Sequence, residues 1–125
     1  MTIRVFIVED DRMVIETYRE ILKMHGFEVI GWSYDGEEAI QKLKKMKPRP
    51  DVVLMDQRLP MKSGVETTLI LLLMDPHLKI LFISADGTAK SAAMASGAVG
   101  FVRKPFDLKE FVSTIKQVVE KGQPQ

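Results

Sequence analysis

The chain of 125 residues contains no cysteine, which excludes disulfide bonds, thiolate nucleophiles and cysteine-ligated metals. A cysteine-free chain fits the reducing cytoplasm, so we expect a cytoplasmic protein. An excess of one charge is also lacking, because 18 Lys and Arg residues balance 17 Asp and Glu residues to a net charge of +1. Proteins that bind nucleic acid directly usually show a strongly basic face, so this composition gives no basis for such binding.

Long hydrophobic runs are absent as well. The longest, Leu69–Met74, has six residues, whereas a membrane span needs roughly 18 or more. The N-terminal stretch MTIRVFIVEDD reaches an acidic residue at position 9, which is unlike a signal peptide. We therefore expect no membrane segment, and one domain over residues 1–121 followed by a flexible tail over residues 122–125. The tail could also be the start of a linker to a further domain.

Five short apolar runs, rich in Val, Ile and Phe, predict strands that are buried on both faces. They cover residues 3–8, 27–32, 51–55, 79–83 and 98–102. Helical patterns separate them, at residues 12–25, from residue 35, from residue 63, at about 88–96 and from residue 107 to about residue 121. Strict alternation of strand and helix predicts an α/β protein with a doubly wound parallel sheet and helices on both faces.

Polar residues gather where these strands end. In such open sheets the ligand site lies beyond the carboxyl ends of the strands. The residues at those ends are Glu9, Asp10 and Asp11 after the first strand, Asp56 after the third, Ser84 after the fourth and Lys104 after the fifth. The sequence therefore predicts a functional site that combines several carboxylates, one hydroxyl and one ammonium group.

This combination favours phosphoryl transfer to a carboxylate. Carboxylates that share a crevice repel one another, and Mg²⁺, which prefers oxygen ligands, relieves the repulsion. Lys104 can hold a phosphate oxygen or pair with Asp56 as a compact positive charge. Asp56 would attack the donor phosphate directly, because a carboxylate is already ionised at neutral pH and needs no general base.

Five motifs in order, IVEDD, LMDQRLP, MKSG, ISAD and GFVRKPF, give the chain a clear family likeness. It resembles the receiver domains of two-component response regulators, in particular a stand-alone regulator of the chemotaxis type. The resemblance implies a flavodoxin-like sheet of five strands in the order 2-1-3-4-5. It also implies that Asp56 is the phosphoacceptor, and that Glu9, Asp10, Asp56 and the backbone carbonyl of Arg58 bind Mg²⁺.

The resemblance assigns three further positions. Ser84 matches the switch hydroxyl and Lys104 the lysine of the family's catalytic set, and the Lys104-Pro105 peptide bond is expected to be cis. Phe101 matches the aromatic switch position, but it lacks a phenolic hydroxyl. Any coupling between Ser84 and Phe101 would therefore depend on packing rather than on a hydrogen bond.

The implied function is signalling controlled by phosphorylation, with a histidine kinase as donor. The domain would catalyse its own Mg²⁺-dependent phosphorylation and dephosphorylation without being a turnover enzyme. A downstream protein would bind the surface of the fourth helix, fifth strand and fifth helix, and we expect a monomer or weak dimer. Exposed residues on or beside that surface are expected to be Lys90, Met94, Arg103 and Lys109.

Alternatives remain at this stage. A phosphoaspartyl hydrolase would usually carry an acid two residues after the nucleophile, where this chain has Arg58. A phosphorylation-independent binding scaffold is the second alternative.

Three further expectations concern single residues and one helix. Asp11 is expected to cap the first helix, and Arg58 and Asp86 are expected to approach each other and shield the phosphoryl group from water. The Leu69–Met74 run predicts a core-facing helix, with a contact to a partner or second copy as an open alternative.

Overall fold

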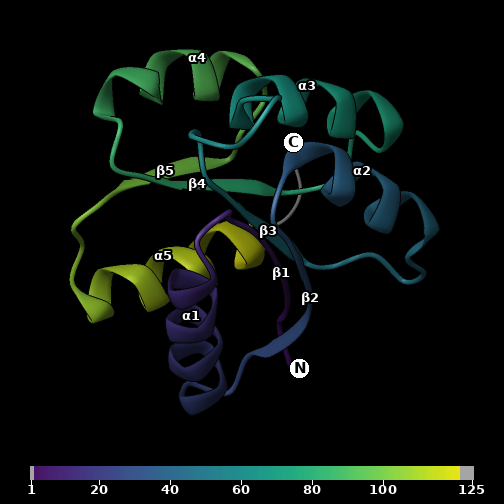
Figure 1. Cartoon of the computed structure of the whole chain (residues 1–125). Helices are drawn as coiled ribbons and strands as arrows, with labels where there is room; N and C mark the ends of the chain where they lie inside the picture. The colour runs from purple at the N-terminus through teal and green to yellow at the C-terminus, as the bar shows by residue number, and fades with distance from the viewer. Residues whose placement is uncertain (1, 122–125) are drawn as a thin grey trace.

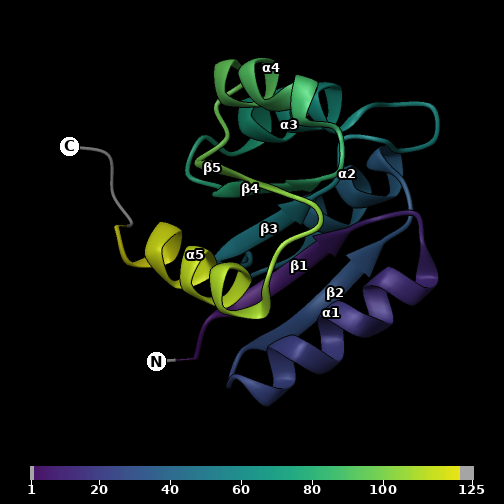
Figure 2. The ribbon, with the colours of Figure 1, turned by 90° about the vertical axis from the view of Figure 1, so that its left-hand side faces the viewer.

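The computed structural model describes residues 2–121 as a five-stranded parallel sheet with the strand order β2-β1-β3-β4-β5 (Figures 1 and 2). The strands are β1 (Arg4–Val8), β2 (Glu28–Ser33), β3 (Val52–Met55), β4 (Ile80–Ser84) and β5 (Gly100–Arg103). The predicted fold class and strand order are confirmed. The predicted tail, residues 122–125, lies outside the described residues.

Helices cover both faces of the sheet. Figure 1 shows α1 (Arg12–Met24) and α5 (Leu108–Glu120) together on one face, and α2 (Gly36–Lys45), α3 (Gly64–Met74) and α4 (Lys90–Ala95) on the other. Because β1, β3 and β4 are covered on both sides, their alternating side chains form two separate cores. Val5, Ile7 and Leu54 belong to the core under α1 and α5, and Phe6 and Val53 to the opposite one.

The fourth helix differs from the prediction of one helix over residues 88–96. A 3-10 turn, η1 (Gly87–Ala89), precedes the shorter α4. The Asp86 side chain accepts a hydrogen bond from the Thr88 backbone N–H at 3.1 Å, and the Asp86 carbonyl accepts one from Ala89. Short-range hydrogen bonds of this kind form a 3-10 turn at the start of a helix. The alanine-rich composition of this segment does not indicate such a turn.

Helix starts follow the predicted caps. The Asp11 carboxylate accepts from the backbone N–H groups of Met13 and Val14, so its expected role as a cap of α1 is confirmed. Ser63 and Glu66 form a reciprocal capping box at the start of α3. Among residues 2–121, no helix combines the length and apolar character needed to cross a membrane.

Helix α3 is only partly core-facing. Leu71 is fully buried against the sheet, but Leu69, Ile70 and Leu73 are 50%, 38% and 86% exposed. An apolar run of this length covers more than one side of a helix, since consecutive residues are separated by about 100°. These three exposed residues define the surface through which α3 would contact a partner or a second copy.

Candidate functional site

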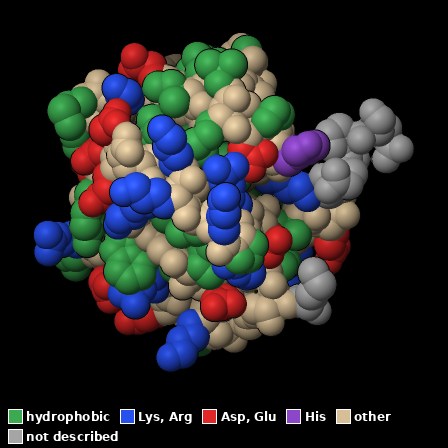
Figure 3. Space-filling model, turned by 90° about the vertical axis from the view of Figure 1, so that its right-hand side faces the viewer, with side chains coloured by type: hydrophobic (Ala, Val, Ile, Leu, Met, Phe, Trp, Pro, Cys, Tyr) green, Lys and Arg blue, Asp and Glu red, His purple; other side chains and the backbone are tan. Residues whose placement is uncertain are grey.

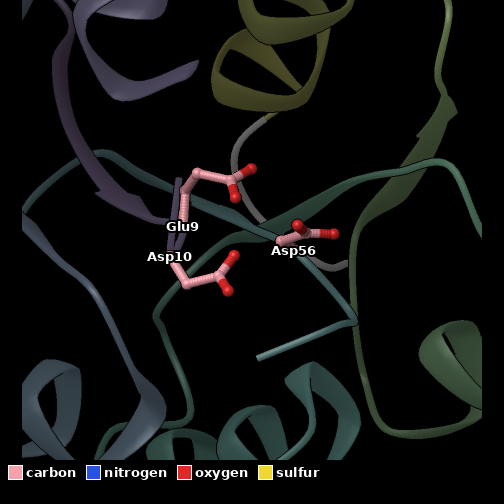
Figure 4. Close-up of side chains that lie close together, drawn as sticks. All are labelled: Glu9, Asp10 and Asp56. Carbon is pink, nitrogen blue, oxygen red and sulfur yellow. The ribbon is translucent and has the colours of Figure 1, made fainter. Parts of the chain in front are cut away.

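Three carboxylates meet at the carboxyl edge of the sheet. Glu9 and Asp10 follow β1, and Asp56 follows β3, whose last residue Met55 is in register with Val8 of β1. One carboxylate oxygen from each of the three acids lies within 4.8 Å of the others, and Figure 4 shows the three side chains converging on one space. The strands thus bring together Glu9 and Asp56, which are 47 positions apart in the sequence.

Glu9 is the buried member of this cluster, with 3% of its surface exposed. Its Oε2 accepts a hydrogen bond of 3.1 Å from the Asp11 backbone N–H. Burial, followed by the negative charge of Asp56, raises the pKa of Glu9 from 4.5 to about 7. The bonds from Asp11 and Lys104 lower that pKa but do not offset the burial. Asp10, in contrast, is exposed.

Lys104 supplies the positive charge of the site. Its Nζ lies 3.1 Å from Glu9 Oε1 and 3.7 Å from Asp56 Oδ2, so one ammonium group bridges two acids. The sequence indicated a pair with Asp56, and the closer pair with Glu9 was not foreseen. The expected cis bond between Lys104 and Pro105 is confirmed. A second cis bond, at Lys47-Pro48, was not predicted.

Ser84 ends β4 beside this cluster and is fully buried. Its Oγ accepts a hydrogen bond of 3.1 Å from the Asp86 backbone N–H, which links the hydroxyl to the loop after β4. On β5, the neighbouring Phe101 stacks on Phe82 with ring centroids 6.1 Å apart and planes 12° apart. The two expected switch positions are therefore tied to the same pair of adjacent strands.

Arg58 and Asp86 line one open cleft of about 600 Å³, together with Asp10. The Asp86 side chain also accepts hydrogen bonds from the hydroxyl and backbone of Thr88. These bonds, the one from the hydroxyl first, and the nearby charge of Arg58 lower the pKa of Asp86. Within residues 2–121, no ion pair joins Arg58 to Asp86. Both residues thus face the cleft, with Asp86 held by the η1 turn.

Gly64 and Gln57 shape the loop beside Asp56, and sequence reasoning gave them no such role. The Gly64 N–H donates to the Gln57 carbonyl at 2.9 Å, and Gln57 Oε1 accepts from the Val65 N–H at 3.0 Å. A Cβ at Gly64 would lie 2.2 Å from the Asp56 carbonyl oxygen, which no real contact allows. The glycine of the MKSG motif was the available signal: it permits α3 to begin against the backbone of Asp56.

Tyr18 of α1 is a second residue that the sequence did not single out. Its ring packs on Phe106 and Phe111, and its hydroxyl is buried without a hydrogen-bond partner among the described residues. It lines an open, mostly apolar groove of about 340 Å³ together with Lys104. Burial, then the charges of Glu9 and Asp56, raise the pKa of Tyr18, so it stays neutral. In the sequence, Tyr18 resembles any aromatic residue on the buried face of a helix, so nothing marks its place beside Lys104.

Comparison with known proteins identifies the family. A sequence model of the response regulator receiver domain matches residues 5–116. The chain belongs to this family. The receiver is 33% identical over 117 residues to the chemotaxis protein CheY of Thermotoga maritima, covering 92% of this chain and 96% of that protein.

The chain is also similar to part of a longer regulator and to one chain of a solved complex. The receiver is 32% identical to the transcriptional regulatory protein DegU of Brevibacillus brevis, covering 96% of this chain but 51% of that protein. The crystal structure of the CheX–CheY–BeF3–Mg²⁺ complex from Borrelia burgdorferi contains a chain that superimposes with a TM-score of 0.87 at 27% identity. That alignment covers 93% of this chain and 88% of the other.

Proposed function

We propose that this receiver accepts a phosphoryl group from a histidine kinase onto Asp56, with Mg²⁺, and that the modified domain switches its binding of a downstream protein in the cytoplasm. The observation that carries the proposal is the convergence of Glu9, Asp10 and Asp56, with the Lys104 ammonium group beside Glu9 and Asp56. Three acids whose oxygens lie within 4.8 Å of one another repel, one lysine does not neutralise them, and a bound cation would relieve that repulsion.

The donor set fits Mg²⁺ rather than a softer metal. It offers only oxygen atoms, and burial, followed by the charge of Asp56, raises the pKa of Glu9, so a bound cation would favour its ionised form. Asp10 and Asp56 would hold the ion directly, with Glu9 acting through water and the carbonyl of Arg58 completing the protein ligands. When bound, the ion would neutralise charge on the transferring phosphoryl group.

The remaining chemistry falls to the residues of the chain. A carboxylate oxygen of Asp56 attacks phosphorus in line, an O–P bond forms, and the P–N bond to the donor histidine breaks. The electron pair of that bond goes to the imidazole nitrogen, which takes up a proton. Lys104 then shifts its contact from the two acids to a phosphoryl oxygen, as a point charge on a flexible stem can.

The output follows from the change of charge at Asp56. Ser84 would turn its hydroxyl from the Asp86 N–H toward the phosphoryl group, and Phe101 would repack against Phe82. The affected surface is that of α4, β5 and α5. The residues expected there, Lys90, Met94, Arg103 and Lys109, are all exposed.

Incubation with Mg²⁺ and a small acyl phosphate tests the proposal. The wild type should gain one phosphoryl group by intact mass, and Asp56→Asn should gain none. Asp107→Asn is the matched control, because Asp107 caps α5 and asparagine caps a helix equally well. Labelling of Asp56→Asn, or labelling of the wild type without Mg²⁺, would contradict the proposal. A folded wild type that never labels would favour the phosphorylation-independent scaffold.

A further inference from the structure

The outer face of α3 is an apolar surface in contact with solvent. Leu69, Ile70 and Leu73 form it and are called here the α3 patch; Leu73 is 86% exposed. They fall within one sector of the helix, because residues three and four positions apart share a face. A helix that is apolar on all sides is usually buried, so the α3 patch indicates a surface that is covered in solution.

Helix α2 lies beside α3 and runs in the same direction (Figure 1). At the N-terminal end of both, Lys62 Nζ lies 3.6 Å from Glu37 Oε1. At the C-terminal end, Arg49 Nη1 lies 3.0 Å from Asp75 Oδ2. The two helices therefore present their first turns at one end of the α3 patch and their last turns at the other.

The charges at the two ends differ in sign. Glu37 and Glu66 lie in the first turns of α2 and α3, whereas Lys44 and Lys45 lie in the last turn of α2. On the face in Figure 3, Lys and Arg side chains lie across the middle with Asp and Glu side chains among them, and hydrophobic side chains are scattered between. Each end also holds one ion pair within the chain, Lys62 with Glu37 and Arg49 with Asp75, so the excess charge is acidic at the first end and basic at the second.

We propose that the α3 patch is the interface of a symmetric dimer of this chain, with the two α3 helices antiparallel about a twofold axis. A surface with opposite charges at its two ends is complementary to itself after a twofold rotation. Glu37 and Lys44 are seven positions apart, or about 10.5 Å along α2. A twofold axis midway between them would bring Glu37 of each copy to Lys44 of the other, in exchange for its contact with Lys62 of its own chain.

The overall charge does not oppose this pairing. A net charge of +1 gives little repulsion between two copies. A second copy also supplies the same apolar residues to cover the α3 patch. The acidic end of this interface lies close to the carboxyl edge of the sheet, because Glu66 lines the same cleft as Asp10 and Arg58.

Sedimentation equilibrium of the full chain, from about 10 µM to about 1 mM, measures the dimer. Leu73→Glu should raise the dissociation constant by about 100-fold or more, because each dimer receives two buried, unpaired carboxylates. Met24→Glu is the matched control: Met24 on α1 is 79% exposed, and its replacement should change nothing. A wild type that stays monomeric throughout, or a dimer unaffected by Leu73→Glu, overturns the proposal.

Charge reversal tests the antiparallel arrangement. Glu37→Lys and Lys44→Glu should each weaken self-association at low ionic strength, since each places like charges across the interface. An equimolar mixture of the two variants should associate again, because every contact then joins Lys to Glu. Variants that bind themselves as well as the wild type does, or a mixture that fails to associate, rule this pairing out. Labelling of Asp56 is measured separately, so its failure leaves this result interpretable.

Discussion

The ammonium group of Lys104 lies closer to Glu9 than to Asp56: Nζ is 3.1 Å from Glu9 Oε1 and 3.7 Å from Asp56 Oδ2. Because Glu9 is nearly inaccessible to solvent, this is the ion pair that makes its ionised form tolerable. Under the proposed function, Lys104 would have two competing roles. It compensates charge beside Glu9 and Asp56, and it would hold an oxygen of the transferred phosphoryl group.

Replacing Lys104 with Met should therefore change two properties in opposite directions. Without the ammonium group, the three acids attract Mg²⁺ more strongly, and isothermal titration should show an affinity roughly threefold to tenfold higher. The rate of labelling by an acyl phosphate should fall by about 100-fold, because a charge that stabilises the transition state is lost. Lys109→Met, at an exposed position on α5, should alter neither. A parallel loss of Mg²⁺ affinity and labelling would contradict this dual role.

Gly64→Ala should damage both stability and the site. The new methyl group would lie 2.2 Å from the Asp56 carbonyl oxygen and 2.9 Å from Gln57 Cα, and neither backbone atom can move independently. We expect a loss of about 1–3 kcal/mol in the free energy of unfolding, measured in urea, and slower labelling. At Gly100→Ala the methyl group meets side-chain atoms only, Leu81 Cδ1 at 3.0 Å and Val118 Cγ1 at 3.6 Å, so a smaller loss is expected. Equal losses in both variants would show that the Asp56 loop tolerates displacement.

Stability should depend on pH through Glu9. Its pKa is about 7 in the folded chain and 4.5 as the ordinary value, so the folded state holds the proton more tightly. This contribution favours folding below pH 4.5 and is lost as the pH rises to 7, by about 3 kcal/mol in all. Unfolding in urea without metal, from pH 4.5 to 8, should show the wild type losing stability relative to Glu9→Gln. A constant difference between the two proteins would remove Glu9 as the cause.

Arg58 and Asp86 should govern how long the phosphoryl group lasts. Both line the cleft at the mouth of the site, so their side chains can restrict the approach of water. Replacing both with alanine should shorten the lifetime of labelled protein severalfold, as followed by phosphate release. Arg19→Ala combined with Glu16→Ala removes an exposed charged pair on α1, outside that cleft, and should leave the lifetime unchanged. An unaltered lifetime in the Arg58 and Asp86 variant would refute the shielding role.

The sequence predicted much of this site because the rules involved are local. Strand runs and caps place Glu9, Asp10 and Asp56 just after strands, and parallel strands bring their carboxyl ends to one edge. The predicted ends of the helices were less accurate. The tighter start before α4 depends on hydrogen bonds of Asp86, which a run of alanines does not encode.

The sequence alone determines the order of strands and helices along the chain, the caps, and the acids that follow the strands. The reason is that periodicity and turn residues act over a few positions. Only the tertiary structure decided that Lys104 lies nearest Glu9, that Gly64 abuts Asp56 and that Leu73 stays outside the core. Those contacts join segments distant in the chain. Their distances and exposures are set by how helices pack on the sheet, and no short stretch of residues carries that information.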